Sequence, residues 1–159
     1  MTQTRASVTL VSATGVGPTN VLTLLTNREI CELRTQAFNR HEVDRLVEVL
    51  AEDVVLRAPG VAYGEGAAAC RDFYKHWFAD FPDARMEVRR RHVTGGVAVE
   101  EGRFLGTHTG RAATGRRVAL DYVQVSCVRD GRQVLLELRF DRLLMLGQLG
   151  LVGDVRAAA

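Results

Sequence analysis

The fold of this chain is decided by one stretch, residues 118–140, which reads VALDYVQVSCVRDGRQVLLELRF. Side chains alternate in character along both halves of this stretch, which is typical of β-strands. The pair Asp130-Gly131 separates the halves and is a strong signal for a tight hairpin turn. The sequence therefore predicts two long antiparallel strands, at residues 118–128 and 134–140.

Two further strands are predicted directly before this hairpin, at residues 86–93 and 97–105. Gly95-Gly96 joins them, and a loop rich in Gly and Thr around residues 106–115 leads to the hairpin. Long strands that follow one another through such connections predict an antiparallel meander.

The chain before the meander has a helical pattern. Thr26 and Glu29 have the spacing of a capping box, in which the two side chains satisfy backbone amides at a helix start. Apolar residues recur at helical spacing over residues 30–38, 43–50 and 69–78. A short strand at residues 53–58 ends at Pro59, and a turn region follows at residues 60–66. Helices followed by a meander predict the α+β class.

The composition is that of an ordinary globular protein, with 47% apolar and 25% charged residues. The net charge of +2 gives no indication of nucleic-acid binding, and no apolar run reaches the roughly 20 residues of a membrane span. The three cysteines form no CxxC pair, and no phosphate-binding or dinucleotide-binding motif is present. We expect a cytoplasmic protein with no metal, no cofactor, no nucleic-acid partner and no membrane contact.

One domain is expected, at residues 26–152. Residues 1–25, rich in Thr, Ser, Val and Gly, are expected to form a flexible N-terminal extension. Residues 153–159 are expected to form a tail.

Short phrases in residues 28–152 carry a resemblance to a known family: Ala37-Phe38-Asn39, Gly64-Glu65-Gly66-Ala67, Phe81-Pro82-Asp83, GTHTG at 106–110 and Phe140-Asp141. Their order and spacing resemble those of SnoaL-like polyketide cyclases. These cyclases belong to the nuclear transport factor 2-like superfamily, with ketosteroid isomerase and limonene epoxide hydrolase. The resemblance implies a cone-shaped α+β barrel, in which N-terminal helices and a curved antiparallel sheet enclose a pocket. It also implies frequent dimerisation through the sheet.

The same resemblance implies a cofactor-independent cyclase or isomerase that acts on a polyketide-like or polycyclic small molecule in secondary metabolism, such as antibiotic biosynthesis. The family's acid/base aspartate falls at Leu138, however, and the isomerase-type base falls near Ala58. Both positions are apolar here. Their loss disfavours aldol cyclisation and favours epoxide opening or pericyclic closure. A non-catalytic binding protein of the same fold stays as an alternative.

Glu101 is the predicted acid/base residue. Glu100 and Glu101 are adjacent on a strand and therefore point to opposite faces. The position of Glu101 lines the pocket in the family, and burial there would raise its pKa into the range of a general acid or base. The alternative interpretation is an ion pair between Glu101 and Arg103 at the rim of the cone.

Gln124 and Tyr122 share one face of the long strand and are predicted to hydrogen-bond a substrate carbonyl. Asp121 would take their place only if a bulge reversed the strand. The other residues that we expect to bind substrate are Leu56, Phe73, Trp77, His92, Arg103 and Leu138. The opposite face carries Val123, Val125 and Cys127, too apolar for a solvated sheet, and predicts a homodimer through this face.

Overall fold

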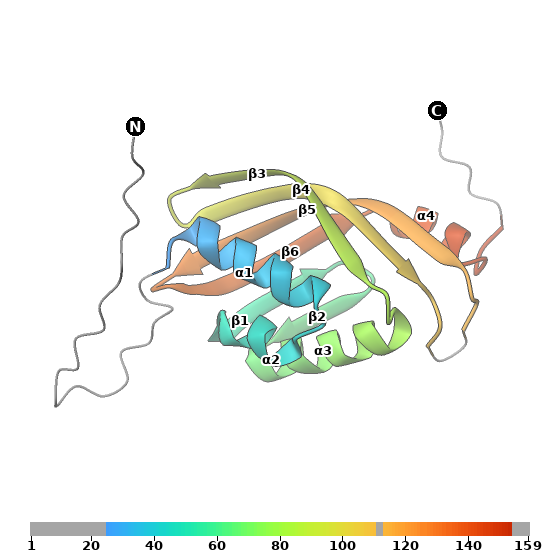
Figure 1. Cartoon of the computed structure of the whole chain (residues 1–159), viewed down its shortest axis with the longest axis horizontal. Helices are drawn as coiled ribbons and strands as arrows, with labels where there is room; N and C mark the ends of the chain where they lie inside the picture. The colour runs from blue at the N-terminus through green and yellow to red at the C-terminus, as the bar shows by residue number, and fades with distance from the viewer. Residues whose placement is uncertain (1–24, 111–112, 154–159) are drawn as a thin grey trace, which may run out of the picture.

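A computed structural model of the chain describes residues 25–110 and 113–153 (Figure 1). The predicted extension at residues 1–25 and the predicted tail at residues 153–159 lie outside these ranges, apart from one residue each. The elements before the meander are α1 (Asn27–Asn39), α2 (Val43–Glu48), β1 (Leu50–Ala58), β2 (Ala62–Glu65) and α3 (Ala67–Asp80). The elements that follow are β3 (Arg85–Thr94), β4 (Val97–Thr107), β5 (Arg117–Arg129), β6 (Arg132–Phe140) and α4 (Arg142–Gln148).

The predicted α+β class and the meander of four strands are confirmed. The capping box forms at α1, where the Thr26 amide donates to Oε2 of Glu29 over 2.8 Å. Asp130 and Gly131 both have positive φ, at 51° and 72°, as the tight β5–β6 turn requires. These local signals fix where the elements begin and turn.

Two local predictions are wrong, and one helix was not predicted. The strand β1 begins at Leu50, because Leu50 and Ala51 are buried in the sheet and do not extend the second helix. Residues 60–66, predicted as a turn region, contain β2, which pairs with β1 as a short hairpin. The helix α4 has no counterpart in the predicted elements; the carboxylate of Asp141 begins it by accepting from the Leu144 amide at 2.9 Å.

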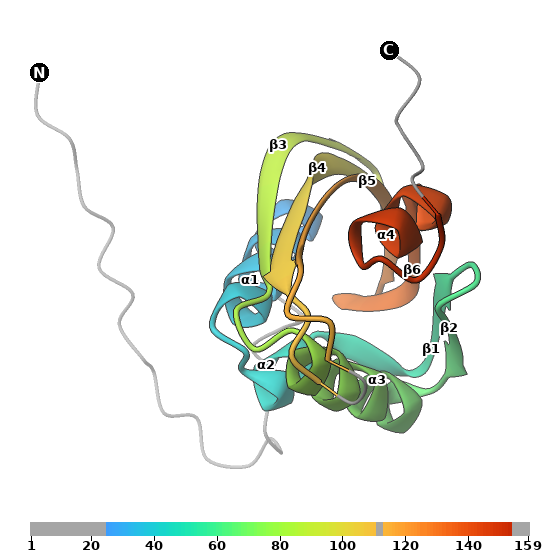
Figure 2. The ribbon, with the colours of Figure 1, turned by 90° about the vertical axis from the view of Figure 1, so that its right-hand side faces the viewer.

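The six strands form one sheet in the order β2-β1-β6-β5-β4-β3. All neighbouring pairs are antiparallel except β1 and β6, which run parallel. The sheet curls, as Figure 2 shows, with α1 and α3 inside the curve. The helix α1 contacts β3 and β4, whereas α3 contacts β1 and β2. This arrangement is the cone that the resemblance implies.

A β-bulge in β3 decides which of its residues face inward. Val88 pairs with Gly102, but Arg90 pairs with Glu101, so β3 carries one extra residue at this point. After the bulge the alternation is reversed. Arg91 therefore points towards α1, and His92 points to the solvent.

Candidate active site: an aromatic pocket with a buried arginine

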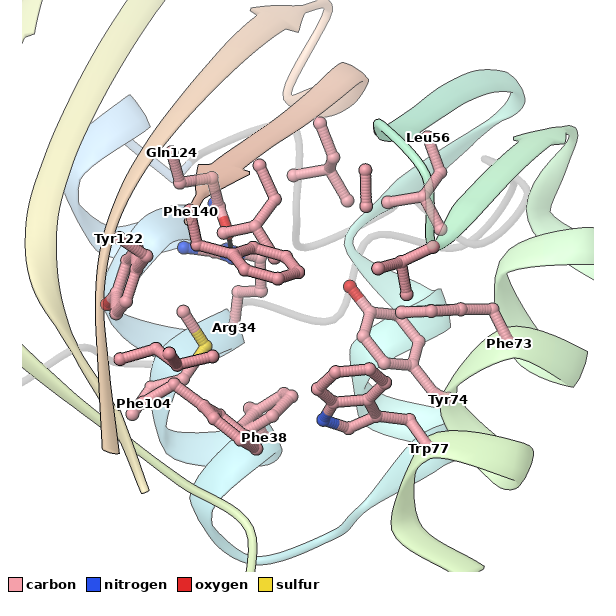
Figure 3. A pocket seen from close by; sticks show the side chains of 16 residues that line it. Arg34, Phe38, Leu56, Phe73, Tyr74, Trp77, Phe104, Tyr122, Gln124 and Phe140 are labelled. Carbon is pink, nitrogen blue, oxygen red and sulfur yellow. Dashed lines mark hydrogen bonds between the residues drawn. The ribbon is translucent and has the colours of Figure 1, made fainter. Parts of the chain in front are cut away.

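The concave face of the sheet, α1 and α3 enclose a pocket (Figure 3). Most of its wall is apolar, which is typical of small-molecule sites. The lining residues are Arg34, Phe38, Leu56, Ala58, Val61, Phe73, Tyr74, Trp77, Met86, Phe104, Leu120, Tyr122, Gln124, Leu136, Leu138 and Phe140. Six of the predicted site residues lie in this wall: Leu56, Phe73, Trp77, Tyr122, Gln124 and Leu138.

The strand β6 forms an entirely apolar part of the wall. Leu136, Leu138 and Phe140 face the pocket. Glu137 and Arg139 lie on the outer face, where Nε of Arg139 donates to Oε1 of Glu137 at 2.9 Å. The position at which the resemblance places an acid/base aspartate therefore faces the pocket and carries a leucine.

Aromatic rings from α3 and β4 form the opposite wall. The rings of Phe73 and Trp77 lie 5.7 Å apart, and Trp77 lies 5.3 Å from Phe104. Rings at these separations make favourable contacts with one another and offer flat apolar surface to a ligand.

Tyr74 brings a polar group into this wall. Its hydroxyl points into the space between the two walls (Figure 3), and no hydrogen-bond partner for it is found among the described residues. Burial raises the pKa of Tyr74 to about 12, although the positive charge of Arg34 opposes this rise. The hydroxyl is therefore a hydrogen-bond donor at neutral pH. Sequence reasoning missed Tyr74, although its spacing of four residues from both Cys70 and Phe78 places it on the buried face of the helix.

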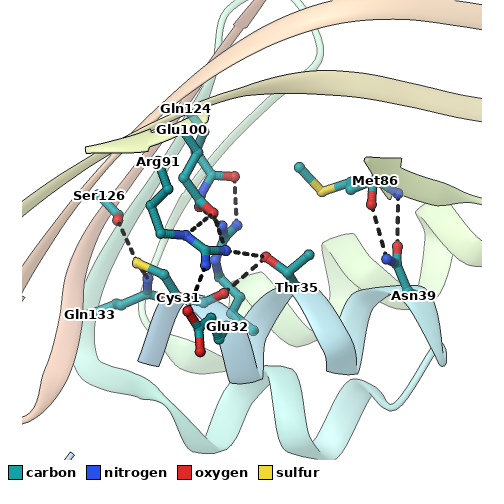
Figure 4. A network of polar contacts seen from close by, with 11 residues as sticks. Cys31, Glu32, Thr35, Asn39, Met86, Arg91, Glu100, Gln124, Ser126 and Gln133 are labelled. Carbon is teal, nitrogen blue, oxygen red and sulfur yellow. Dashed lines mark hydrogen bonds and ion pairs between the residues drawn. The ribbon is translucent and has the colours of Figure 1, made fainter. Parts of the chain in front are cut away.

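Arg34, on α1, is the charged residue that lines the pocket, and sequence reasoning missed it too. Its side chain is only 3% exposed. Nη1 donates to Oε1 of Gln124 at 2.6 Å, and Nη2 pairs with the carboxylate of Glu100 (Figure 4). The spacing of Arg34 from Ile30 and Phe38, four residues in each direction, was the signal that placed it on the apolar face of its helix.

Glu100 connects two arginines inside the protein. It is fully buried. Its Oε1 accepts a hydrogen bond from Nε of Arg91 at 2.8 Å, and its Oε2 accepts one from Nη2 of Arg34. Nε2 of Gln124 also lies 3.4 Å from Oε2. Arg91 continues the network to Glu32, at 3.3 Å, on the exposed side of α1. Burial is the largest single effect and lowers the pKa of Arg34. The Glu100 carboxylate, together with smaller contributions from Tyr74, Cys31 and Tyr122, outweighs burial and holds the pKa of Arg34 above its ordinary value.

The predicted burial of Glu101 is wrong. Its side chain is 45% exposed on the outer face of the sheet, 3.7 Å from Arg90. The inner face of β4 instead carries Ala98, Glu100 and Gly102, which are buried. The helix α1 and the side chain of Tyr122 pack against this face, where the small residues leave space for them. The buried carboxylate of this strand is therefore Glu100, and two arginines already pair with it.

The predicted placement of His92 and Arg103 in the pocket is also wrong. His92 is exposed because the bulge in β3 reverses the alternation beyond Val88. Arg103 lies on the outer face of β4, 3.8 Å from Asp121. The register of β4 with β5 has no shift, so Asp121 stays on that outer face and does not enter the pocket.

Tyr122 lines the pocket with its ring, but its hydroxyl oxygen is buried and has no hydrogen-bond partner within the described ranges. Burial raises the pKa of Tyr122 to about 12, so this group stays protonated at neutral pH. The hydroxyl lies over Gly102, where an added Cβ would come within 2.6 Å of it. The predicted role of Tyr122 in polarising a substrate oxygen would therefore require the side chain to move.

We expect Gly102→Ala to lower the free energy of unfolding by about 2 kcal/mol or more, because the added methyl group overlaps the Tyr122 hydroxyl and the Glu87 carbonyl oxygen. Urea denaturation followed by fluorescence measures this change. Gly153→Ala is the matched control, since a Cβ at Gly153 meets nothing within 4 Å. Equal stability of the two variants would contradict the close approach at Gly102.

In the part of the chain that the structure describes, no group of three or more His, Cys, Asp or Glu side chains is placed to hold a metal ion. In the same residues, no helix has the length and apolar character needed to span a membrane.

The SnoaL-like domain family matches residues 32–136, and the chain belongs to this family. No curated protein sequence matches the chain significantly. Among solved structures, the suggested polyketide cyclase IdmH of Streptomyces antibioticus has a TM-score of 0.66 and 29% identity, with 77% of this chain and 97% of that chain covered.

Two further solved structures show the shared fold. AclR of Streptomyces galilaeus, a suggested hydroxylase, has a TM-score of 0.70 and 21% identity, with 81% of this chain and 83% of that chain covered. A suggested SnoaL-like polyketide cyclase from a Jannaschia species has a TM-score of 0.69 and 17% identity, with 86% of this chain and 97% of that chain covered.

Proposed function

We propose that this protein is a cofactor-independent enzyme of secondary metabolism that closes a ring in a polyketide-like, mainly apolar small molecule. Membership of the SnoaL-like family and the likeness to IdmH support this class of substrate. The observation that carries the proposal is the chemistry of the pocket wall. Its polar side chains are Arg34, Tyr74, Tyr122 and Gln124, and no carboxylate or imidazole is among the lining residues.

This wall favours pericyclic closure over aldol cyclisation. An aldol reaction needs a group that removes and returns protons, whereas a pericyclic closure only redistributes electrons within the substrate. A pocket accelerates such a closure by holding the reacting carbons close together and aligned. A hydrogen bond from Tyr74 to a substrate carbonyl would add electrostatic stabilisation. Gln124 has a different role here: Arg34 and Glu100 engage both ends of its amide, so it positions Arg34.

Epoxide opening is the second candidate, and Tyr74 is the observation that favours it. Opening an epoxide requires a proton or a hydrogen bond at the leaving oxygen. The hydroxyl of Tyr74 is protonated, faces the pocket and is unpartnered among the described residues. Tyr74→Phe would therefore abolish epoxide opening and slow pericyclic closure only modestly.

The proposal is tested by incubating the protein with linear polyketide-type compounds that carry a conjugated carbonyl group or an epoxide. Conversion to a product of equal mass and different retention, measured by liquid chromatography and mass spectrometry, supports ring closure. Binding of the compounds without conversion of any of them would overturn the proposal in favour of a binding protein.

Glu101→Gln is expected to leave turnover within about twofold of the wild type, because an exposed carboxylate outside the pocket cannot carry a proton to the substrate. Steady-state kinetics on the substrate found in the preceding assay measures this. A loss of about 100-fold, the usual scale for a general acid/base, would restore the acid/base role of Glu101.

We also propose a homodimer through the outer face of the sheet. Val123 and Val97 on this face are 40% and 43% exposed, and Val125 pairs with Val99 beside them. Light scattering at micromolar concentration is expected to give twice the chain mass of 17.5 kDa. Val123→Arg should shift the protein to the monomer, whereas a wild type that is already monomeric would refute the proposal.

A further inference from the structure

We propose that the pocket binds ligands that carry an ionised acidic oxygen, a carboxylate or the enolate of a 1,3-dicarbonyl group, and that Arg34 receives this oxygen. This inference rests on the proposed function only in taking the pocket as the substrate site. It adds the chemical class of the substrate: an apolar skeleton with an acidic group at one end.

The first observation is an unsatisfied donor. Arg34 has five N–H groups, and its two hydrogen bonds go to Gln124 and Glu100. Its Nε atom is buried without an acceptor among the described residues, although the side chain lies in the pocket wall. A buried donor without an acceptor is unfavourable, and a ligand oxygen that accepts from it would remove that penalty. Nε and a terminal nitrogen form one edge of the guanidinium group, and two parallel N–H donors on such an edge match the two oxygens of a carboxylate.

The second observation is the balance of charge beside the pocket. The network beside the pocket contains one fully buried carboxylate, Glu100, which is shared by two arginines: Arg34, which is buried, and Arg91, which is 11% exposed. The partner that would balance them, Glu32, is 45% exposed, so water screens its charge. Glu100 does not line the pocket. The pocket therefore faces an arginine whose charge is not fully compensated inside the protein.

Among the described residues that line the pocket, Arg34 is the only ionised group. Tyr74 on α3 and Tyr122 on β5 both have a pKa of about 12 and are neutral at pH 7. Cys31, on α1, lies behind the wall, and burial raises its pKa. The Tyr74 hydroxyl is a second donor for the same acidic group. A neutral ligand would leave the positive charge of Arg34 balanced only by the carboxylate that it shares with Arg91, whereas an anion would supply a second negative partner.

The test uses a pair of probes with one shape and different charge: 4-cyclohexylbutanoate and 4-cyclohexylbutanamide. Trp77 is the only tryptophan of the chain and lies in the pocket wall, so its fluorescence reports binding. At pH 7 we expect the acid to bind at least about tenfold more tightly than the amide, the scale of one charge-assisted hydrogen bond. Equal binding, or tighter binding of the amide, would overturn the proposal.

Variants test whether Arg34 is the residue that causes the preference for the acid. Arg34→Met should abolish the preference for the acid, and the double change Arg34→Met/Glu100→Gln does the same while also removing the buried carboxylate. Arg45→Met, at an arginine 64% exposed on α2, is the matched control and should keep the preference. A preference that survives in a folded Arg34 variant would refute the role of Arg34. If neither Arg34 variant folds, the comparison of acid and amide on the wild-type protein decides alone.

The outcomes separate this inference from the proposed function. A preference for the acid with no conversion of any compound would uphold the inference and refute the catalytic proposal. Conversion of neutral compounds together with equal binding of the two probes would refute the inference alone.

Discussion

Glu100→Ala is expected to lower the free energy of unfolding by about 3–5 kcal/mol, the usual cost of removing one partner of a buried ion pair. Glu100 is fully buried, and the guanidinium groups of Arg34 and Arg91 both contact its carboxylate. Without it, the buried guanidinium group of Arg34 would have no carboxylate partner, and the neighbouring Arg91 would keep only its pair with Glu32. Domains are stable by only about 5–15 kcal/mol, so this loss is a large share of the total.

The neighbouring residue provides the matched control. Glu101→Ala removes the same chemical group from the same strand, but the group is half-exposed and its partner Arg90 lies 3.7 Å away. We expect it to change stability by less than about 1 kcal/mol, as for surface ion pairs. Urea denaturation of both variants, followed by Trp77 fluorescence, makes the comparison. Equal losses of unfolding free energy at the two positions would contradict the prediction that the buried ion pairs of Glu100 stabilise the fold.

The contrast between these glutamates shows how far the sequence alone determines the site. Alternation along β4 predicts that one of the two is buried, but it does not say which. The resemblance to the family assigned the inner face to Glu101. The inner face instead carries Gly102, because the ring of Tyr122 needs the space that a side chain would occupy. Such packing across strands is not visible in the sequence of one strand.

Regular elements were predictable where local chemistry decides them. The capping box at Thr26 and the turn at Asp130-Gly131 formed as predicted, and alternation placed Leu138 at the pocket wall. The bulge in β3 was not predictable, because it depends on pairing with β4. Its consequence for the site is large: it brings Arg91, in place of His92, into contact with Glu100.

The two polar pocket residues on helices were missed for a different reason. Arg34 and Tyr74 both lie at helical spacing on apolar stripes, so a polar residue on a buried helix face is the signal that identifies them. The resemblance instead directs attention to the strands, where it places the family's acid/base group. The chain retains the fold and the pocket, but its charged lining residue is Arg34 on α1, which contacts Gln124, the residue that pairs with Leu138 across the sheet.

If the pocket acts through its shape, filling it should abolish activity. Leu138→Trp is expected to lower turnover by about 100-fold or more, since a misplacement of about 1 Å in the reacting atoms can cost that much. Leu138 is partly buried and its side chain lines the pocket, so we expect the larger ring to extend into the pocket and not into the strand. The fold should therefore be retained, with a melting temperature close to that of the wild type.

Leu143→Trp is the control for adding an indole, because Leu143 is 53% exposed on α4 and lies outside the pocket. Kinetics on a converted compound and calorimetric titration with 4-cyclohexylbutanoate give two independent readings of each variant. A mechanism by shape requires that Leu138→Trp loses both turnover and binding, while Leu143→Trp and Glu101→Gln keep both. Full turnover in Leu138→Trp would place the chemistry elsewhere, because a substrate excluded from the pocket would still be converted.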